Sequence, residues 1–328
     1  MTIKDVAKEA GVSVATISRV LNNIDSVSEA TRQKVMQAVE KTGYQQNLLG
    51  KHLRCNKTNI ILVMLTTIVN SFCAKLVHSI DNEAKKYGYN IMICATNNDQ
   101  ETEERYLNYV RNKLVDGIII INSVMSEEKM ALLSANFPVV QCSEYIDGKT
   151  TPYVTIDNKK AAFDAVNHLI ENGRRKILFI GVDNKLGSSR DRYLGYRQAL
   201  KENGIEFDPK LVIDGNYGYR NAHELTTKYF NGKVDIDAVF AISDKMAAGA
   251  ITSIKECGCN VPDDVMVMGF DNTDITYIYN PTISTVAQPH KDMGKAAFDM
   301  LIKRINDENC ENLILKHELK LRESTNNL

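Results

Sequence analysis

The segment DVAKEAGVSVATISRVLNN, residues 5–23, contains two short amphipathic stretches that meet at a single glycine. Thr2 and Asp5 have the spacing of a helix capping box, and Gly11 predicts the end of this first helix because glycine adopts the left-handed backbone readily. Ser13 is then a predicted cap for a second helix. Two short helices joined in this way form a helix-turn-helix. The residues expected to face inward are Val6, Ala7, Ala10, Ile17, Val20 and Leu21.

A third helix is expected between Ser28 and Gly43, which completes a small helical bundle over residues 1–46. Residues 1–58 carry nine Lys or Arg and five Asp or Glu, a net charge of +4 in a chain whose net charge is −1. A basic head on an acidic body is typical of a protein whose head meets a polyanion. DNA binding is one interpretation of this head, and a plain helical hairpin is the other. The third helix is expected to bury Val35, Met36 and Val39.

The seven cysteines are scattered along the chain. Cys257 and Cys259 stand close together, but no second pair has metal-ligand spacing, so we expect no metal site and reduced thiols. The charged start of the chain lacks the apolar core of a signal peptide, and no apolar run is long enough to cross a bilayer. We therefore expect a cytoplasmic protein that has no membrane partner and needs no cofactor.

From residue 59 to residue 328 the pattern changes to short apolar strands that alternate with amphipathic helices. Strands that are apolar throughout are buried on both faces, which predicts parallel sheets covered by helices. The units divide near residue 157 into two similar halves, so the expected body is α/β, with two doubly wound lobes that face each other across a ligand cleft. The predicted strands are 60–65, 90–95, 117–121, 138–142, 176–181, 210–213, 238–242 and 265–270.

An enzyme is disfavoured by the motifs that the sequence lacks. The first strand is followed by TTIVNSF, residues 66–72, rather than by a glycine-rich dinucleotide fingerprint. There is no phosphate-loop motif and no nucleophile elbow. The six histidines have no metal-ligand spacing, and we expect His168 to lie on a helix surface rather than to act as a base.

The head resembles the DNA-binding domain of the LacI/GalR family of bacterial transcriptional regulators through TIKDVAKEAGVSVATISRVLN, VSEATRQKV and GYQQN. The resemblance implies that the second helix enters the major groove. Arg19 can make a bidentate contact with guanine, whereas Val14 and Ala15 offer apolar contacts to base edges. The hydroxyl groups of this helix suit contacts with phosphates. The implied DNA-binding residues of the head are Ser13, Val14, Ala15, Thr16, Ser18, Arg19 and Asn22.

Residues 47–58, NLLGKHLRCNKT, correspond to the family's hinge helix, which places a leucine in the minor groove beside its two-fold mate. Leu53 occupies that position, and such an apolar wedge bends the duplex. The sequence departs from the family at Gln46, where proline is common, and at Gly50 and Lys51. Because glycine costs about 1 kcal/mol against alanine inside a helix, this hinge is expected to fold with difficulty. A plain flexible linker is the alternative.

The body resembles the family's effector domain, which is related to periplasmic sugar-binding proteins, through VDGIII, VTIDN, AAFDAV, SSRDRYLGYRQAL, FAISDKMAAGA, VPDDVMVMGFDNT and LRES. The resemblance implies interlobe crossings near 157–160, 286–290 and 318–322. It implies an effector that is a sugar or a sugar acid, and it suggests that Arg192 pairs with Asp157. Turn aspartates also cap helices, which is the structural alternative. The implied effector residues are Thr66, Asn70, Phe72, Asp157, Arg190, Tyr217, Ser243, Asp271 and Gln288.

These observations predict a sequence-specific DNA-binding regulator, a repressor, that is controlled by a carbohydrate effector in the interlobe cleft. A homodimer presents two recognition helices to a palindromic operator in double-stranded DNA. The tail lacks a heptad pattern, so we expect a dimer rather than a tetramer. One alternative is control by a protein corepressor such as a phosphocarrier. Another is a transport-type sugar-binding protein, which the missing export signal disfavours.

Overall fold

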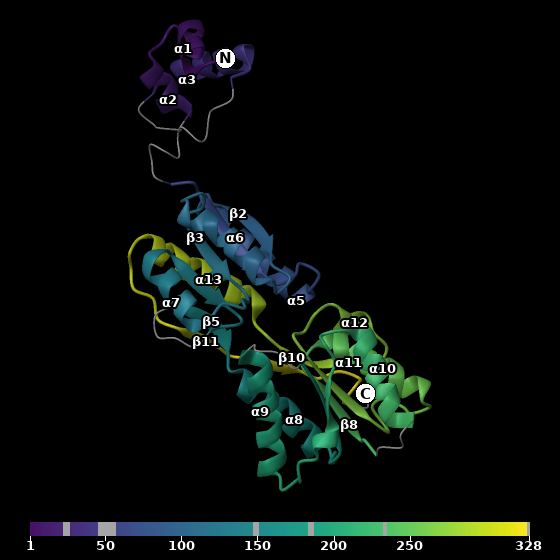
Figure 1. The fold of residues 1–328 in the computed structure, drawn as a ribbon. Helices are drawn as coiled ribbons and strands as arrows, with labels where there is room; N and C mark the ends of the chain where they lie inside the picture. Colours follow the sequence, from purple (N-terminus) through teal and green to yellow (C-terminus); the bar gives the residue numbers. More distant parts are fainter. Residues whose placement is uncertain (22–26, 45–56, 147–150, 183–186, 232–234, 327–328) are drawn as a thin grey trace. The chain divides into compact units, whose positions relative to one another are not determined.

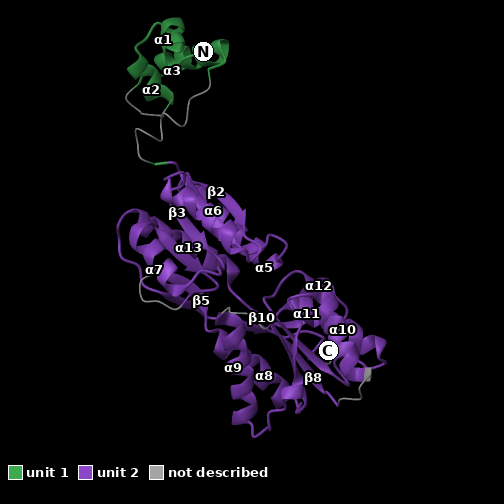
Figure 2. Ribbon diagram, in the orientation of Figure 1, with its two compact units in different colours: residues 1–57 green, residues 58–328 purple. Residues whose placement is uncertain are grey.

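The computed structural model describes residues 1–21, 27–44, 57–146, 151–182, 187–231 and 235–326. The chain divides into two compact units, residues 1–57 and residues 58–328, and each is described by itself (Figure 2). Asn22 and the predicted hinge residue Leu53 lie outside the described residues.

The described residues of the first unit form three helices, as the sequence predicts. The capping box at the first helix is present, because the Thr2 backbone N–H donates to Asp5 Oδ2 at 2.7 Å. Gly11 ends that helix with a φ of 65°, and Gly43 ends the third with a φ of 61°. Val6, Ile17 and other apolar residues form a small core between the helices. The helices are α1 (Ile3–Ala10), α2 (Val14–Leu21) and α3 (Glu29–Thr42).

One predicted core residue of the head is wrong. Met36 is 52% exposed, whereas Val35 is fully buried and Ala38 is 4% exposed. A helix turns by about 100° per residue, so the position directly after Val35 points away, and the position three residues later returns to the same face. Val39 is partly buried against the core, as expected.

The second unit contains two six-stranded sheets, each the centre of one lobe (Figure 1). All neighbouring strands are parallel except β12, which runs antiparallel to β10. The first sheet has the order β11 (Leu313–Leu315), β5 (Tyr153–Ile156), β4 (Val139–Cys142), β3 (Gly117–Ile120), β1 (Ile60–Leu65) and β2 (Asn90–Ala95). The second has the order β12 (Glu318–Lys320), β10 (Ser284–Ala287), β9 (Met266–Phe270), β8 (Ala238–Ala241), β6 (Ile177–Gly181) and β7 (Val212–Asp214).

Helices pack against both sheets. In the first lobe α13 packs on α5 and on the central strands, although the two helices are far apart in sequence. In the second lobe α8 packs on α9, and α10 packs on α11. The first lobe has α5 (Ser71–Lys86), α6 (Gln100–Arg111), α7 (Glu127–Asn136) and α13 (His290–Ile305). The second has α8 (Asn158–Glu171), α9 (Gly187–Glu202), the 3-10 turn Pro209–Leu211, α10 (Tyr219–Asn231), α11 (Asp244–Glu256) and α12 (Ile275–Ile278).

The chain crosses between the lobes three times: between β5 and α8, between β10 and α13, and between β11 and β12. The predicted α/β class with two doubly wound lobes is therefore confirmed. The eight predicted strands are all present to within two residues at each end, while the short strands β5, β10, β11 and β12 were not among them. None of the helices in the described ranges has both the length and the apolar composition needed to cross a membrane.

Close packing of α9 on α8 depends on Gly195. A Cβ atom at this position would lie 2.8 Å from the Ala162 Cβ and 2.9 Å from the Phe163 backbone nitrogen. Backbone atoms cannot move aside cheaply, so any side chain here forces the two helices apart. Because α9 also carries Arg190 and Arg192, the same packing sets the position of both guanidinium groups.

We expect Gly195→Ala to lower the free energy of unfolding of the body by roughly 1–3 kcal/mol through overpacking. Urea denaturation of the full chain, followed by circular dichroism, measures this change. Gln198→Ala on the same helix is the control, and it should alter stability by no more than about 0.5 kcal/mol. Equal stability of the two variants would contradict the packing assigned to Gly195.

Candidate DNA-binding surface and effector site

The second helix of the head presents an exposed face formed by predicted DNA-binding residues. Val14 is 40% exposed, and Ala15 and Arg19 are also exposed. Ile17 and Val20 on the same helix are buried. This division fixes which side of α2 is available to a partner.

Side-chain hydroxyl groups cap the start of α2. Ser13 Oγ accepts a hydrogen bond from the Thr16 backbone N–H at 3.1 Å and lies 2.9 Å from Thr16 Oγ1. This is the cap expected from the sequence. Ser18 is half-buried, so it contributes less surface than Arg19.

In the body, Arg192 is the centre of a buried polar cluster at the carboxyl ends of the second-lobe strands. Its Nε donates to Asn158 Oδ1 at 3.0 Å, and its Nη1 donates to the Ile242 carbonyl at 2.9 Å. The guanidinium lies over the Phe270 ring, 3.6 Å from its centroid, and 4.0 Å from Asp271 Oδ1. Arg192 is 6% exposed, so every one of these partners offsets the cost of burying its charge.

The expected pair between Arg192 and Asp157 is wrong. Asp157 Oδ1 accepts from the Lys160 backbone N–H at 2.8 Å, so Asp157 caps α8. Its neighbour Asn158 is 5% exposed and supplies the oxygen that Arg192 uses. The carboxylate prefers the free N–H groups of the helix start, which leaves the guanidinium to the next residue.

Asp271 and Gln288 meet inside the same cluster. Gln288 Nε2 donates to Asp271 Oδ1 at 2.8 Å. Gln288 is 4% exposed, and Asp271 is 8% exposed. Asp271 follows β9 with a φ of 108°, a conformation that a non-glycine residue adopts only when its surroundings hold it there. The structure thus brings together two predicted effector residues beside Arg192.

A second buried carboxylate, that of Asp244, holds the loop after β9 in place. Asp244 accepts hydrogen bonds from the Thr273 backbone N–H at 2.6 Å, from Thr273 Oγ1 at 2.8 Å and from Thr285 Oγ1 at 2.5 Å. These bonds tie the start of α11 to the loop after β9 and to β10. Ser243, the predicted effector residue beside Asp244, caps α11 by accepting from the Met246 backbone N–H.

The other predicted effector residues make contacts of their own outside this cluster. Tyr217 has its hydroxyl 2.8 Å from Ser189 Oγ, and Arg190 is an exposed residue whose Nε lies 3.3 Å from Asp191 Oδ1. Thr66 Oγ1 donates to Asn98 Oδ1 at 3.1 Å. Two residues serve the fold instead: Asn70 caps α5, and Phe72 is only 5% exposed, within the hydrophobic core.

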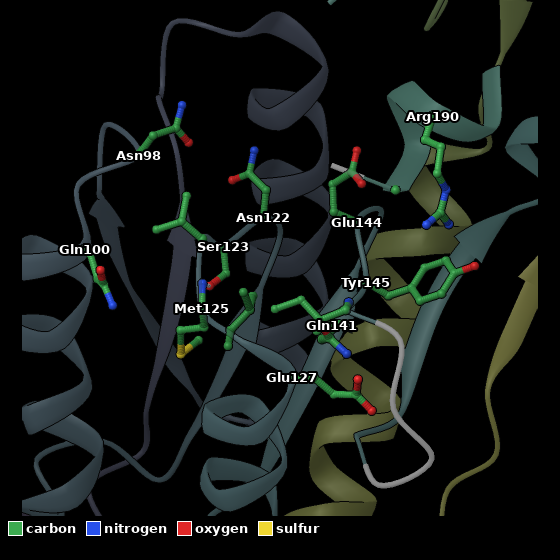
Figure 3. Close-up of a pocket in the computed structure, with 14 residues that line it drawn as sticks. Asn98, Gln100, Asn122, Ser123, Met125, Glu127, Gln141, Glu144, Tyr145 and Arg190 are labelled. Atoms are coloured by element: carbon green, nitrogen blue, oxygen red, sulfur yellow. Dashed lines mark hydrogen bonds between the residues drawn. The ribbon is translucent and has the colours of Figure 1, made fainter. Parts of the chain in front are cut away.

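A cavity of about 700 Å³ lies on the first-lobe side of this region (Figure 3). Its wall comes from the segments that follow β2, β3 and β4 and from the start of α9, which is where the carboxyl ends of parallel strands place a ligand. Arg190 is the one predicted residue that lines it. The other lining residues were not predicted from the sequence, although the rule on strand ends points to the loops that carry them. They include Asn98, Asn122, Gln141 and Glu144.

Among the described residues, Glu144 and Lys75 each make contacts that join the lobes directly. Glu144, after β4, accepts from the Ser188 backbone N–H at 3.1 Å and from the Ser188 hydroxyl. Lys75 on α5 lies 2.7 Å from the Asp274 carboxylate and donates to the Asn272 carbonyl at 3.3 Å. Within the described part of the chain, no group of three His, Cys, Asp or Glu side chains is arranged to hold a metal ion.

Burial raises the pKa of Asp244, and the nearby Asp271 carboxylate raises it further. Burial also raises the pKa of Asp271, although Arg192 and Gln288 oppose this effect. The folded protein therefore keeps protons that the unfolded chain loses above the ordinary carboxyl pKa of 3.8. It follows that these groups lower the stability as the pH rises from about 4 toward neutrality.

We expect Asp244→Asn to become more stable relative to the wild type as the pH rises from 5 to 8, because the variant lacks a carboxyl group that must ionise when buried. The free energies of unfolding in urea at the two pH values measure this difference. Asp263→Asn on the surface should follow the wild type. A parallel pH dependence of the Asp244 variant and the wild type would refute the assignment.

Each of the two units matches a known protein family. Residues 2–47 match the family of bacterial regulatory proteins of the lacI family, and residues 58–323 match the periplasmic binding proteins and sugar binding domain of the LacI family. The chain is 38% identical to the HTH-type transcriptional regulator RegA of Clostridium saccharobutylicum, over 99% of each chain.

Two solved structures also cover 99% of both chains. One is the Lac repressor dimer bound to operator and the anti-inducer ONPF, with 25% identity and a TM-score of 0.89. The other is a complex of the transcriptional regulator CelR with cellobiose, with 29% identity and a TM-score of 0.74. The chain therefore belongs to the lacI family of bacterial regulatory proteins, and its function is DNA-binding regulation of transcription.

Proposed function

We propose that this protein is a repressor whose affinity for a palindromic operator changes when a carbohydrate effector binds in the interlobe cleft. It acts as a homodimer, because one small head has too little surface for tight and specific binding. The observation that carries the proposal is the buried cluster of Arg192, Asp271 and Gln288 at the carboxyl ends of the second-lobe strands. Planar polar groups of this kind are suited to hydrogen bonds with the hydroxyl groups of a carbohydrate.

On the DNA side, α2 lies in the major groove with its exposed face toward the bases. Arg19 reads a guanine, and Val14 and Ala15 contact apolar base edges. Ser13, Thr16 and Ser18 hold phosphates, which fix the register. Asn22 and Leu53 complete the contacts, with Leu53 as the minor-groove wedge.

On the effector side, Asp271 and Gln288 hold hydroxyl groups of the ligand, and Tyr217 and Ser243 border the same space. Thr66 and Arg190 contribute from the rim, and Asn70, Phe72 and Asp157 act by shaping the elements that surround it. The complex of the related regulator CelR with cellobiose supports a carbohydrate as the ligand class.

The two sites communicate through the angle between the lobes. Contacts from Glu144 to Ser188 and from Lys75 to Asp274 bridge the lobes, so a ligand that changes their spacing must alter these bonds. A coupling free energy of about 1–3 kcal/mol would change operator affinity some 5- to 150-fold.

Arg19→Lys is expected to reduce discrimination for one guanine by about 1–3 kcal/mol while it keeps the positive charge, because lysine cannot form the bidentate pair. Selection from a random duplex library, followed by fluorescence anisotropy on single-base variants, measures this. Arg32→Lys on α3 is the matched control and should keep the wild-type preference. If Arg19→Lys instead lowered the binding affinity equally for all duplexes, Arg19 would be assigned to phosphate binding.

Asp271→Asn is expected to weaken effector binding by about 1.5–3 kcal/mol, because hydrogen bonds to a charged acceptor are stronger than those to an amide. Calorimetric titration of the full chain with a carbohydrate panel measures this loss, and Asp263→Asn serves as the surface control. Affinity that is unchanged by Asp271→Asn would place the ligand elsewhere. A wild-type chain that binds no carbohydrate, but whose operator affinity responds to a phosphocarrier, would favour the protein-corepressor alternative.

A further inference from the structure

The cavity on the first-lobe side has a wall chemistry that the proposed function does not use. It is formed by the loop after β2, the loop after β3, the end of β4 with the residues that follow, and the first turn of α9 (Figure 3). Glu103 holds one part of this wall, since its Oε1 accepts from the Val124 backbone N–H at 3.0 Å. Part of the cavity wall is therefore held in place by this hydrogen bond. Its polar lining includes Asn98, Asn122, Glu127, Gln141, Glu144 and Arg190.

Gln141 has a hydrogen-bond donor that no described residue satisfies. This residue on β4 is 1% exposed and lines the cavity, and its Oε1 accepts from the Ile146 backbone N–H at 2.8 Å. Its Nε2 is buried and has no hydrogen-bond partner within the described part of the chain. A buried donor without an acceptor is costly, so an acceptor oxygen on a ligand gains the full benefit of this bond.

The charges of the wall disfavour an anionic ligand. Glu127 and Glu144 present two carboxyl groups, and Arg190 is the one cationic residue among the described residues of the lining. The Arg190 guanidinium already lies beside Asp191, at 3.3 Å. An added carboxylate or phosphate would meet like charges and little free positive charge. Hydroxyl groups both donate and accept, so they match the amides of Asn98 and Asn122 as well as the carboxyl groups.

The cavity is also large, and it adjoins the buried cluster. A volume of about 700 Å³ corresponds to roughly twenty water molecules at about 30 Å³ each, which is more than one sugar ring displaces. Glu144 lines the cavity and bonds Ser188, which lies one helical turn before Arg192 on α9, so the two regions are neighbours. A ligand that holds one ring at Asp271 can place a second ring beside Gln141.

We propose that this cavity is the subsite for a second, uncharged ring, so that the effector is a neutral disaccharide or longer carbohydrate rather than a sugar acid or a sugar phosphate. Gln141 Nε2 donates to an oxygen of that ring and determines specificity for ligands that reach it. Glu127 rejects ligands that carry an anionic group there. The inference depends on the proposed function, because it assumes that the effector binds in the interlobe cleft.

The first test is calorimetric titration of the full chain with maltose, cellobiose and lactose and with the aldonic acid of each. We expect one neutral disaccharide to bind about tenfold or more tightly than its acid. Glu127→Gln should narrow this difference, because it removes one repelling charge. An acid or a sugar phosphate that binds more tightly than the neutral sugar would overturn the inference, although the cleft would remain the effector site.

The second test is Gln141→Leu, which keeps a similar volume and removes both the unsatisfied donor and the acceptor of the Ile146 backbone N–H, so circular dichroism first checks that the variant folds. We expect about tenfold weaker binding of the disaccharide and unchanged binding of glucose. Gln198→Leu, outside the cavity, is the control. Equal losses for glucose and disaccharide, or no loss for either, would overturn the subsite. If the wild type binds none of these sugars, the proposed effector class fails, and the inference fails with it.

Discussion

The buried guanidinium of Arg192 is the constraint on which the proposed effector site depends. A charge taken out of water must be paired and hydrogen-bonded, or the fold loses several kcal/mol. Arg192 meets this demand with Asn158 at a lobe crossing, the Ile242 carbonyl after β8, and Asp271 and Phe270 at the end of β9. Three separate segments are thereby held around one side chain. The strained backbone of Asp271 persists because these partners fix it.

The same cluster sets the electrostatic character of the cleft. Arg192 lies beside Asp271, and burial raises the pKa of the Asp271, Asp244 and Glu144 carboxyl groups. The excess of carboxyl groups favours ligands that bring hydroxyl groups rather than negative charge. The contacts between the lobes use some of the same side chains, since Glu144 both lines the cavity and bonds Ser188. A ligand placed there competes directly with a bond that holds the lobes together.

The sequence predicts most of the fold because most elements have a local signal, whereas the short strands β5, β10, β11 and β12 were not predicted. Gly11 and the capping box define the helix-turn-helix, and continuous apolar runs define the buried parallel strands. The predictions are wrong where a shift of one position changes the role of a residue. Met36 points outward beside the buried Val35, and Asn158 rather than Asp157 bonds Arg192. The cavity could not be found residue by residue, because Asn98, Asn122 and Gln141 come together only when the sheet forms. Gln141 in particular stands inside an apolar strand.

The central claim is that the cleft and the DNA surface share one equilibrium. Linkage requires that the effector change operator affinity by the same factor by which the operator changes effector affinity. The most direct measurement is calorimetric titration of the effector into the free protein and into the protein saturated with its selected operator. We expect two different effector affinities, whose ratio equals the change in operator affinity measured by anisotropy. Identical effector affinities in the presence and absence of operator would contradict it.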